Sequence, residues 1–282
     1  MKLSPKSVQR IAWALCWAAG VIAVFALLLI IGFVFVRGVG AIDWEFLSTS
    51  PRGGLSGEGG ILSALVGTVY IVLLTLAIAG PLGIGAGIYL AEYAKDNWFT
   101  SFVRYGVEAL AGVPSIVFGL FGFALLVVAL HLSFSILSGG VTLACLVLPT
   151  IIRTSEEAMK AVPRSYREAS LALGATRWQT IRQVVLPAAV PGIVTALILA
   201  IGRSVEETAC LYVTMGGSAN MPTSILSNGR TLSLHLYYLA METLAMEKAL
   251  ATGVILIATI VVINSATRWL SSFYLARMQG RS

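Results

Sequence analysis

Arg203 and Glu207 are the residues of this sequence best suited to anion chemistry. They lie four positions apart at the end of a long apolar run, which places them on one face of a helix. Charged residues in or beside a membrane usually face a cavity or a charged partner. Because a guanidinium donates two parallel hydrogen bonds to an oxyanion, we expect Arg203 to pair with Glu207 at rest and to meet a passing anion. A plain salt bridge at the helix end is the alternative.

Arg153, which follows another apolar run, is a third candidate. It serves either as part of an inner anion path or as a basic anchor at the cytoplasmic end of a helix. The acidic residues are spread thinly, the two histidines stand alone, and the three cysteines have no paired spacing. The sequence has no Gly-Lys pair and hence no phosphate-binding loop for ATP. We therefore expect no catalytic, metal or cofactor site in this chain.

The charged stretch 153–182 has the local signals of two short helices. Two capping-box patterns occur in it, at Thr154–Glu157 and at Thr176–Gln179. Pro163 is typical of a first helical turn, and Gly174 is typical of a helix stop in the left-handed conformation. These signals predict two helices joined by a glycine turn, which would make a docking element. An ordinary charged loop is the alternative.

The composition identifies the solvent in which these elements fold. Hydrophobic residues make up 57% of the 282 positions and charged residues only 11%, with a mean hydropathy of +0.88. A soluble domain typically carries about 25% charged residues, so a purely soluble enzyme is excluded. The net charge of +6 comes from basic residues that flank apolar runs, which argues against a nucleic-acid partner. We expect an all-α polytopic membrane protein surrounded by membrane lipids.

Six membrane-spanning helices are predicted, because a span needs roughly 20 apolar residues. Serines and glycines mark a break near 131–140 between the third and fourth, and the turn residues of 208–229 favour a loop with a short or re-entrant segment. The predicted spans are 11–36, 61–86, two within 109–152, one between Arg182 and Arg203, and one between Lys248 and Arg268.

The basic residues predict the orientation of these spans. With the N-terminus inside, the cytoplasmic segments hold 14 Lys and Arg and the outer segments hold 5, so both termini are expected in the cytoplasm. The domain organisation that follows is a first helix with an outer loop (1–60), a core (61–268) containing the cytoplasmic loop 153–187, and a cytoplasmic tail (269–282).

The cytoplasmic loop contains a spaced motif, with three, nine and one residue between successive parts: Glu168, Ala169 and Ser170, then Gly174, then Val184, then Leu186 and Pro187. This motif resembles the EAA loop of ABC-importer permeases. Serine in the third place and valine for isoleucine are mild departures. The resemblance implies the type I (MetI-like) architecture and a coupling helix that docks into a cytoplasmic ATPase. An ATPase-independent channel or secondary transporter would not need such a loop.

Further segments are similar to phosphate-importer permeases of the PstA type, namely 110–122, 148–154, 221–226 and 235–237. This resemblance implies a PstC-type permease partner, a PstB-type ATPase dimer that binds ATP and Mg, and a PstS-type extracytoplasmic phosphate-binding protein. It also implies a bacterial or archaeal plasma membrane, which is the inner membrane in a Gram-negative cell. Another oxyanion, such as phosphonate, sulfate or molybdate, is the alternative cargo.

Three further expectations concern Glu206, the outer loop and the glycines of residues 80–87. The family pattern around Arg203 has a glycine where this chain has Glu206, and an added acid repels an anion. The outer loop 203–248 is long enough to meet a binding protein, with Arg230, Tyr237 and Tyr238 as contact candidates. Small residues allow close helix packing, which we expect of the glycines in 80–87, chiefly at positions 83 and 87.

Overall fold

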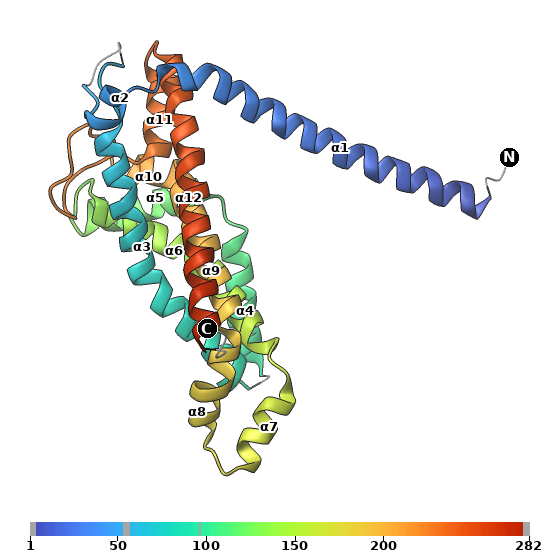
Figure 1. The fold of residues 1–282 in the computed structure, drawn as a ribbon. Helices are drawn as coiled ribbons and strands as arrows, with labels where there is room; N and C mark the ends of the chain where they lie inside the picture. The colour runs from blue at the N-terminus through green and yellow to red at the C-terminus, as the bar shows by residue number, and fades with distance from the viewer. Residues whose placement is uncertain (1–3, 53–56, 96, 279–282) are drawn as a thin grey trace.

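The computed structural model describes residues 4–52, 57–95 and 97–278. The described residues form helices joined by short segments, with one isolated bridge between Pro51 and Gly59 in place of any strand (Figure 1). Lys2 and Arg281, which the orientation count includes, lie outside these residues, as do residues 279–282 of the expected tail. The long helices are α1 (Pro5–Gly38), α3 (Leu62–Ile88), α6 (Ile136–Lys160), α9 (Leu186–Glu206) and α12 (Met246–Met278).

Shorter elements connect these helices. On the outer side lie η1 (Val39–Ala41), α2 (Trp44–Ser48), α10 (Ala209–Thr214) and α11 (Leu232–Glu242). Toward the other end lie η2 (Tyr89–Tyr93), α4 (Trp98–Ala111), α7 (Arg164–Ala172), α8 (Arg177–Thr180) and η4 (Ile181–Val185), and α4 leads into α5 (Ser115–Gly122) and η3 (Phe123–Ala129). Three of these, η2, η3 and η4, are π-helical turns. Helix α10 is the short segment expected within 208–229.

Five helices of the described chain are long and apolar enough to cross a membrane, and a bent pair raises the number to six. The bent pair is α4 with α5 and η3, which meet at 100°, in the place of the predicted third span. Pro114 is the N-cap of α5 with φ −58° and ψ 139°, because proline has no N–H and forces its neighbour out of the helical region. Helix α4 was not predicted, since Arg104 and Glu108 divide its apolar residues.

Helix α6 extends further than the sequence indicates. Arg153 was expected to close the span and Thr154 to begin a new helix, yet α6 continues to Lys160. That prediction is wrong because the added turns bury Ser155 and Met159 against the bundle, and this packing outweighs a local capping signal. Pro163 is the N-cap of α7, one position before the first turn in which it was predicted.

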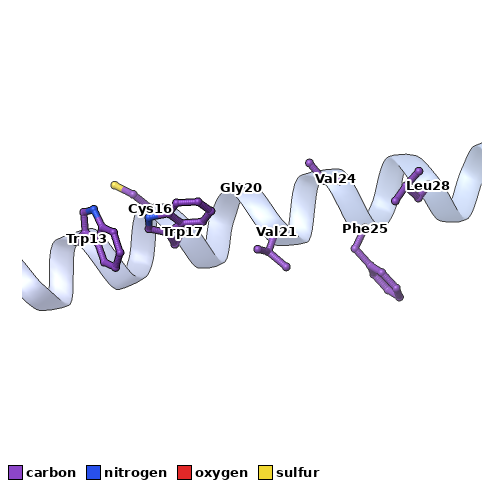
Figure 2. Close-up of a pocket in the computed structure, with 8 residues that line it drawn as sticks. All are labelled: Trp13, Cys16, Trp17, Gly20, Val21, Val24, Phe25 and Leu28. Atoms are coloured by element: carbon purple, nitrogen blue, oxygen red, sulfur yellow. The ribbon is translucent and has the colours of Figure 1, made fainter.

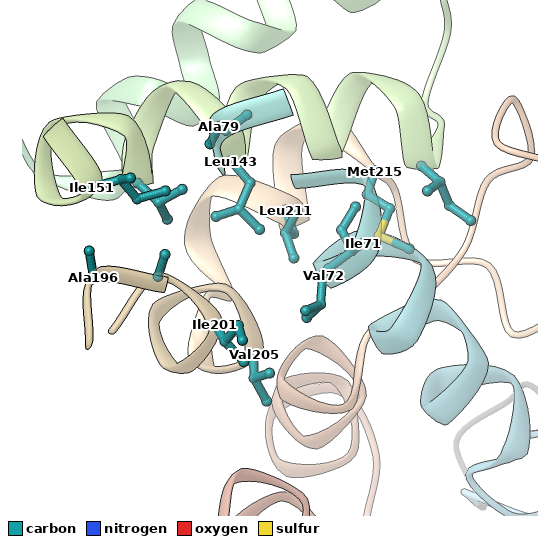
Figure 3. Packing of buried hydrophobic residues seen from close by; sticks show 14 residues of the cluster. Ile71, Val72, Ala79, Leu143, Ile151, Ala196, Ile201, Val205, Leu211 and Met215 are labelled. Carbon is teal, nitrogen blue, oxygen red and sulfur yellow. The ribbon is translucent and has the colours of Figure 1, made fainter. Parts of the chain in front are cut away.

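The core lies between α3, α6 and α9, where small residues let the helices approach closely. A Cβ on Gly83 would lie 2.7 Å from the side chain of Ile151, and one on Gly87 would lie 2.7 Å from the Cβ of Ser155. The expectation of close packing at these two glycines is confirmed. Figure 3 shows the buried apolar side chains of this core, which include Leu143 of α6 and Leu211 of α10.

Helix α1 leaves the bundle near α2 and extends away from it (Figure 1). It touches α12 near its C-terminal end, where a Cβ on Gly38 would lie 2.6 Å from the carbonyl oxygen of Leu250. None of its most apolar window is buried within the chain. Figure 2 shows part of this helix with no other helix in view, and Trp13, Trp17 and Phe25 on it are exposed in the described chain. Such a surface requires lipid or another apolar protein surface around it.

Candidate coupling loop and transport-pathway residues

Of the two short helices predicted on either side of Gly174, the first is present as α7. The second, α8, is the first turn of a helix that continues to Glu206. Gly174 has φ +85°, so a side chain there would be strained. The Gly174 amide donates to the Leu171 carbonyl at 3.0 Å, and the Ala175 amide donates to the Ser170 carbonyl at 3.3 Å. These two bonds are the Schellman motif that ends a helix. The sequence expectation for Gly174 is confirmed.

Helix α8 begins with the expected capping box. The Thr176 hydroxyl accepts from the Gln179 amide, and the Gln179 side chain accepts from the Thr176 amide. The hydroxyls of Ser170 and Thr180 lie 2.9 Å apart, which joins α7 to α8 directly. We refer to residues 164–180 as the coupling hairpin. Because its turn and both helix ends are held by hydrogen bonds, the hairpin can move as one unit.

The coupling hairpin is fixed to the membrane helices through Glu92. Glu92 is buried in η2, and its carboxylate lies 2.6 Å from the Arg167 guanidinium of α7. The same guanidinium donates to the carbonyls of Val162 and Met159 at 2.7 and 2.8 Å. A charge-assisted pair with further hydrogen bonds is among the stronger polar contacts. It connects the hairpin to the end of α3.

Arg177 supplies a second attachment from the other side of the glycine turn. Its guanidinium donates to the backbone carbonyl of Glu92 and lies 5.2 Å from the centre of the Tyr93 ring, within cation–π range. Glu92, Arg167 and Arg177 were not predicted as functional residues from the sequence. Glu92 ends a long uncharged run, and a carboxylate there was the available signal that a basic partner would be needed.

The face of α7 that points away from the bundle is apolar. Tyr166 and Leu173 are 53% and 89% exposed, and together with Ala169 they have the spacing of one helix face. Glu168 is exposed as well. An apolar surface on a polar segment of the chain marks a site for a protein partner.

The remaining motif residues lie in the helix that follows. Val184 belongs to η4, and Leu186 and Pro187 open α9, so the chain is helical from Arg177 to Glu206. Leu186 packs on a cluster of buried side chains: Met159, Val162, Ile181, Val185, Ala189 and Ile193. The second half of the motif therefore joins the coupling hairpin rigidly to α9.

Arg203, at the far end of α9, pairs with two carboxylates. Its guanidinium lies 3.3 Å from Glu207 and 3.2 Å from Glu206. The Glu207 side chain is 4% exposed and also accepts from the Cys210 amide at 3.3 Å, whereas Arg203 and Glu206 are about half exposed. Glu207 is thus held in place, and Glu206 can be displaced. Because Arg203 is accessible, an anion can reach it by replacing Glu206.

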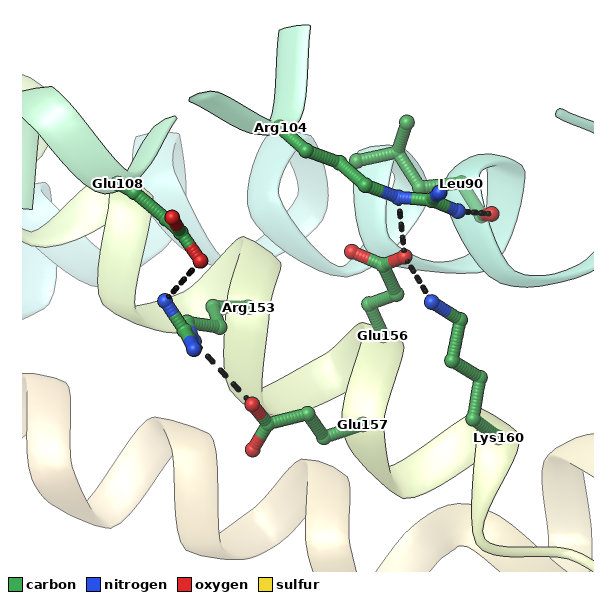
Figure 4. A network of polar contacts seen from close by, with 7 residues as sticks. All are labelled: Leu90, Arg104, Glu108, Arg153, Glu156, Glu157 and Lys160. Atoms are coloured by element: carbon green, nitrogen blue, oxygen red, sulfur yellow. Dashed lines mark hydrogen bonds and ion pairs between the residues drawn. The ribbon is translucent and has the colours of Figure 1, made fainter. Parts of the chain in front are cut away.

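Arg153 belongs to a charged network between α4 and α6 (Figure 4). Its guanidinium lies 2.6 Å from Glu108 and 3.2 Å from Glu157. One turn further, Glu156 lies 2.9 Å from Arg104 and 2.6 Å from Lys160. The network fastens α4 to α6. This role of Arg153 is closer to the predicted anchor than to the predicted part of an anion path.

Arg230 lies in a small outer cluster with His235 and Tyr238. Its guanidinium donates to the Gly217 carbonyl at 3.0 Å and to His235 Nδ1 at 3.1 Å, and it lies 4.4 Å from the centre of the Tyr238 ring. Burial, and then the charges of Arg230 and Lys248, lower the pKa of His235 to about 3. His235 is therefore a neutral acceptor. Through these contacts Arg230 holds the outer loop in place. Tyr237 lies on the surface.

Comparison with protein families gives these sites a context. Residues 83–275 match the model of the binding-protein-dependent transport system inner membrane component. The chain belongs to this family: it is a permease subunit of an ABC importer and a multi-pass plasma-membrane protein. The matched region contains the coupling hairpin, the Arg203 site and the Arg153 network.

Individual relatives agree with this family assignment. The chain is 32% identical to the probable ABC transporter permease protein YqgI of Bacillus subtilis, over 96% of this chain and 97% of that protein. It is 35% identical to the phosphate transport system permease protein PstA of Yersinia pestis, over 90% and 86% of the two chains.

Solved structures show that the fold is shared. A chain of a bacterial alginate ABC transporter, in complex with an alginate pentasaccharide-bound periplasmic protein, superposes with a TM-score of 0.69. The sequence identity is 15%, and the match covers 96% of this chain and 97% of the other. A chain of the inward-facing MetNI methionine transporter gives a TM-score of 0.59 at 22% identity, over 75% and 96% of the two chains. The predicted MetI-like architecture is confirmed.

Proposed function

We propose that this chain is the permease subunit of an importer for inorganic phosphate. Its 35% identity to a phosphate transport permease over most of both chains carries the proposal. The expected partners are a PstC-type permease that completes the pore, a PstB-type ATPase dimer and a PstS-type phosphate-binding protein. ATP and Mg belong to the ATPase, and this chain contributes no cofactor of its own. In a Gram-negative cell the location is the inner membrane.

Coupling to ATP hydrolysis is assigned to the hairpin. The apolar face of Tyr166, Ala169 and Leu173 docks on the ATPase, since no other described part of the chain covers it. Movement of the docked hairpin reaches α3 through the pair between Arg167 and Glu92, and reaches α9 through the continuous helix. Both paths consist of short polar contacts or unbroken helix, so they transmit displacement rather than absorb it.

In the pore, Arg203 is the residue that meets phosphate. The anion replaces Glu206 on the guanidinium, while the buried Glu207 keeps Arg203 in position. Binding is limited by this exchange, because the carboxylate and the anion compete for the same donors. Such competition favours release, which a transport site needs as much as capture.

The test is ATP hydrolysis by the reconstituted complex of this chain with its neighbouring permease, ATPase and binding protein. Phosphate-loaded binding protein is expected to stimulate hydrolysis, and Gly174→Val, which strains the turn, is expected to abolish that stimulation. Gly106→Val is the matched control, because a Cβ there meets nothing within 4 Å of the described chain. Absence of both a complex and stimulation would reject the coupling assignment.

Another oxyanion is the second candidate cargo. The YqgI relative has a name that specifies no substrate, so the same assay should include phosphonate, sulfate and molybdate. Stimulation by one of these oxyanions instead of phosphate would support an ATP-driven importer with a different substrate. A channel or secondary transporter is distinguished by co-purification, because it would retain no ATPase subunit.

A further inference from the structure

A pocket of about 580 Å³ lies beside the coupling hairpin. The proposed transport cycle uses the Arg167–Glu92 pair in its wall but assigns no ligand to the pocket itself. It lies between the hairpin, η2 and the cytoplasmic ends of α4 and α6. The lining residues are Leu90, Ala91, Glu92, Ala94, Arg104, Lys160, Arg164, Arg167, Glu168 and Arg177. Arg203 lies at the opposite end of α9 from η4, so the pocket is separate from the pore site.

The pocket carries an excess of positive charge. Five of its lining residues are cationic and two are acidic, and the neighbouring Glu156 adds one more carboxylate between Arg104 and Lys160. Within the described residues Arg164 has no hydrogen-bond or ion-pair partner, and the side chain of Lys160 is half exposed. Arg164 is therefore available to an anionic ligand, and Lys160 can meet the same ligand with the exposed side of its ammonium group while it stays paired with Glu156.

The elements around the pocket also carry the aromatic residues expected at a membrane interface. Tyr89 and Tyr93 of η2 stack with ring centres 6.5 Å apart, and Trp98 and Phe102 of α4 stack at 5.8 Å. All four are exposed in the chain. Tyrosine and tryptophan collect at the level of lipid head groups. Arg177 of the pocket lining lies 5.2 Å from the centre of the Tyr93 ring, so the pocket borders the aromatic residues of η2.

We propose that this pocket binds the phosphate group of an anionic phospholipid from the cytoplasmic leaflet. Arg164 and Lys160 hold the phosphate, and the acyl chains lie along the aromatic surface of η2 and α4. Basic pockets between membrane helices on the cytoplasmic side suit such head groups. A free phosphate ion shares the head-group chemistry but gains nothing from the aromatic surface. A lipid here would lie between the Glu92 attachment and the charged network, where it would steady the coupling hairpin.

The test is lipid retention by the purified complex containing the full-length chain, measured by native mass spectrometry. The probes are dioleoylphosphatidylglycerol, dioleoylphosphatidylcholine and inorganic phosphate. Wild-type protein is expected to retain phosphatidylglycerol preferentially. Arg164→Gln should weaken that retention about fivefold, and adding Lys160→Gln should weaken it about fivefold again. Arg182→Gln, an exposed arginine outside the pocket, is the matched control and should change nothing.

Several outcomes would overturn the proposal. Equal retention of the two lipids, or the same loss in Arg182→Gln, would show that the pocket does not select an anionic head group. Tighter binding of inorganic phosphate than of phosphatidylglycerol would assign the pocket to a free anion. If Arg164→Gln releases the ATPase subunit from the complex and leaves lipid retention unchanged, the pocket instead binds an acidic side chain of the ATPase. Because the assay measures no transport, its result is independent of the proposed cargo, and size-exclusion profiles confirm that each variant is folded.

Discussion

The Arg203 side chain is paired with the buried Glu207 and is still half exposed to solvent. Glu207 is buried and fixed by the Cys210 amide, whereas Glu206 is exposed and contributes a weaker contact. The two carboxylates therefore differ in role although they are adjacent in sequence. In the proposed pathway, Glu206, which departs from the family pattern, competes with the anion for the Arg203 guanidinium.

Arg203 and its neighbour Glu206 should respond to substitution in opposite ways. Arg203→Gln is expected to abolish phosphate uptake and leave assembly intact, because only the anion donor is lost. Glu206→Gln should lower the apparent KM for phosphate about two- to fivefold, since an exposed ion pair contributes at most about 1 kcal/mol. Uptake assays in proteoliposomes measure both. Unchanged uptake in Arg203→Gln would remove Arg203 from the pathway.

His235 predicts a pH dependence of the outer cluster. Its pKa is lowered from an ordinary value of 6.5 to about 3, so the folded state disfavours protonation. Stability is complete above pH 6.5 and falls as the pH drops toward 3, by about 2 kcal/mol at pH 5. His235→Asn keeps an acceptor for Arg230 without a titrating group. Its Tm should decline less than that of wild type between pH 7 and pH 4, and equal declines would contradict the assignment.

At the scale of elements, one attachment of the coupling hairpin is an ion pair that joins residues 75 positions apart in sequence. Glu92 is buried, so removal of Arg167 leaves a carboxylate without its counter-charge. Breaking one partner of a buried pair costs about 3–5 kcal/mol, whereas removing both can be nearly neutral. The pair therefore matters more for how the hairpin is attached than for net stability.

A double-mutant cycle measures this attachment. Arg167→Met alone should destabilise the protein and uncouple ATP hydrolysis from the phosphate-loaded binding protein. Arg167→Met with Glu92→Gln should recover much of the stability but not the coupling, because the mechanical connection stays broken. Thermal unfolding and stimulated ATPase activity are the two readouts. Additive losses of Tm would show that the two residues do not interact.

At the scale of the whole molecule, α1 is the element with the least support from the rest of the chain. It meets α12 near its C-terminal end, where a Cβ on Gly38 would lie 2.6 Å from the Leu250 carbonyl oxygen and one on Gly253 would lie 3.4 Å from Val34. Most of its other apolar surface is exposed (Figures 1 and 2). Because such a surface requires a bilayer or another subunit around it, we expect the orientation of α1 to depend on the assembled transporter and its membrane.

A pair of alanine substitutions tests the junction. Gly38→Ala places a Cβ 2.6 Å from the Leu250 carbonyl oxygen and should force α1 away from α12, with a lower yield of assembled complex. Gly40→Ala, at a position with nothing within 4 Å in the described chain, should have no effect. Size-exclusion chromatography of the detergent-solubilised complex compares the two. Equal yields would show that the junction does not determine assembly.

The sequence by itself determined the features that depend on local chemistry. Apolar runs specify a polytopic membrane protein, because a hydrocarbon core accepts only helices of sufficient length or closed barrels. Gly174 and Thr176 specify the turn of the coupling hairpin through backbone conformation and capping alone. Arg203 and Glu207 pair as expected, because a spacing of four residues fixes their proximity on one helix.

The tertiary structure alone decided the features that depend on partners distant in sequence. No local signal shows that Glu92 pairs with Arg167 or that Glu108 pairs with Arg153. Nor does one show that burial of Met159 extends α6 beyond its predicted end. Pro114 marks the break between α4 and α5 locally, but the 100° angle between the two helices is not visible in the sequence, because hydropathy records how apolar a segment is and not its direction. Local signals fix helices and turns, but contacts between helices decide how the coupling hairpin is attached to the membrane domain.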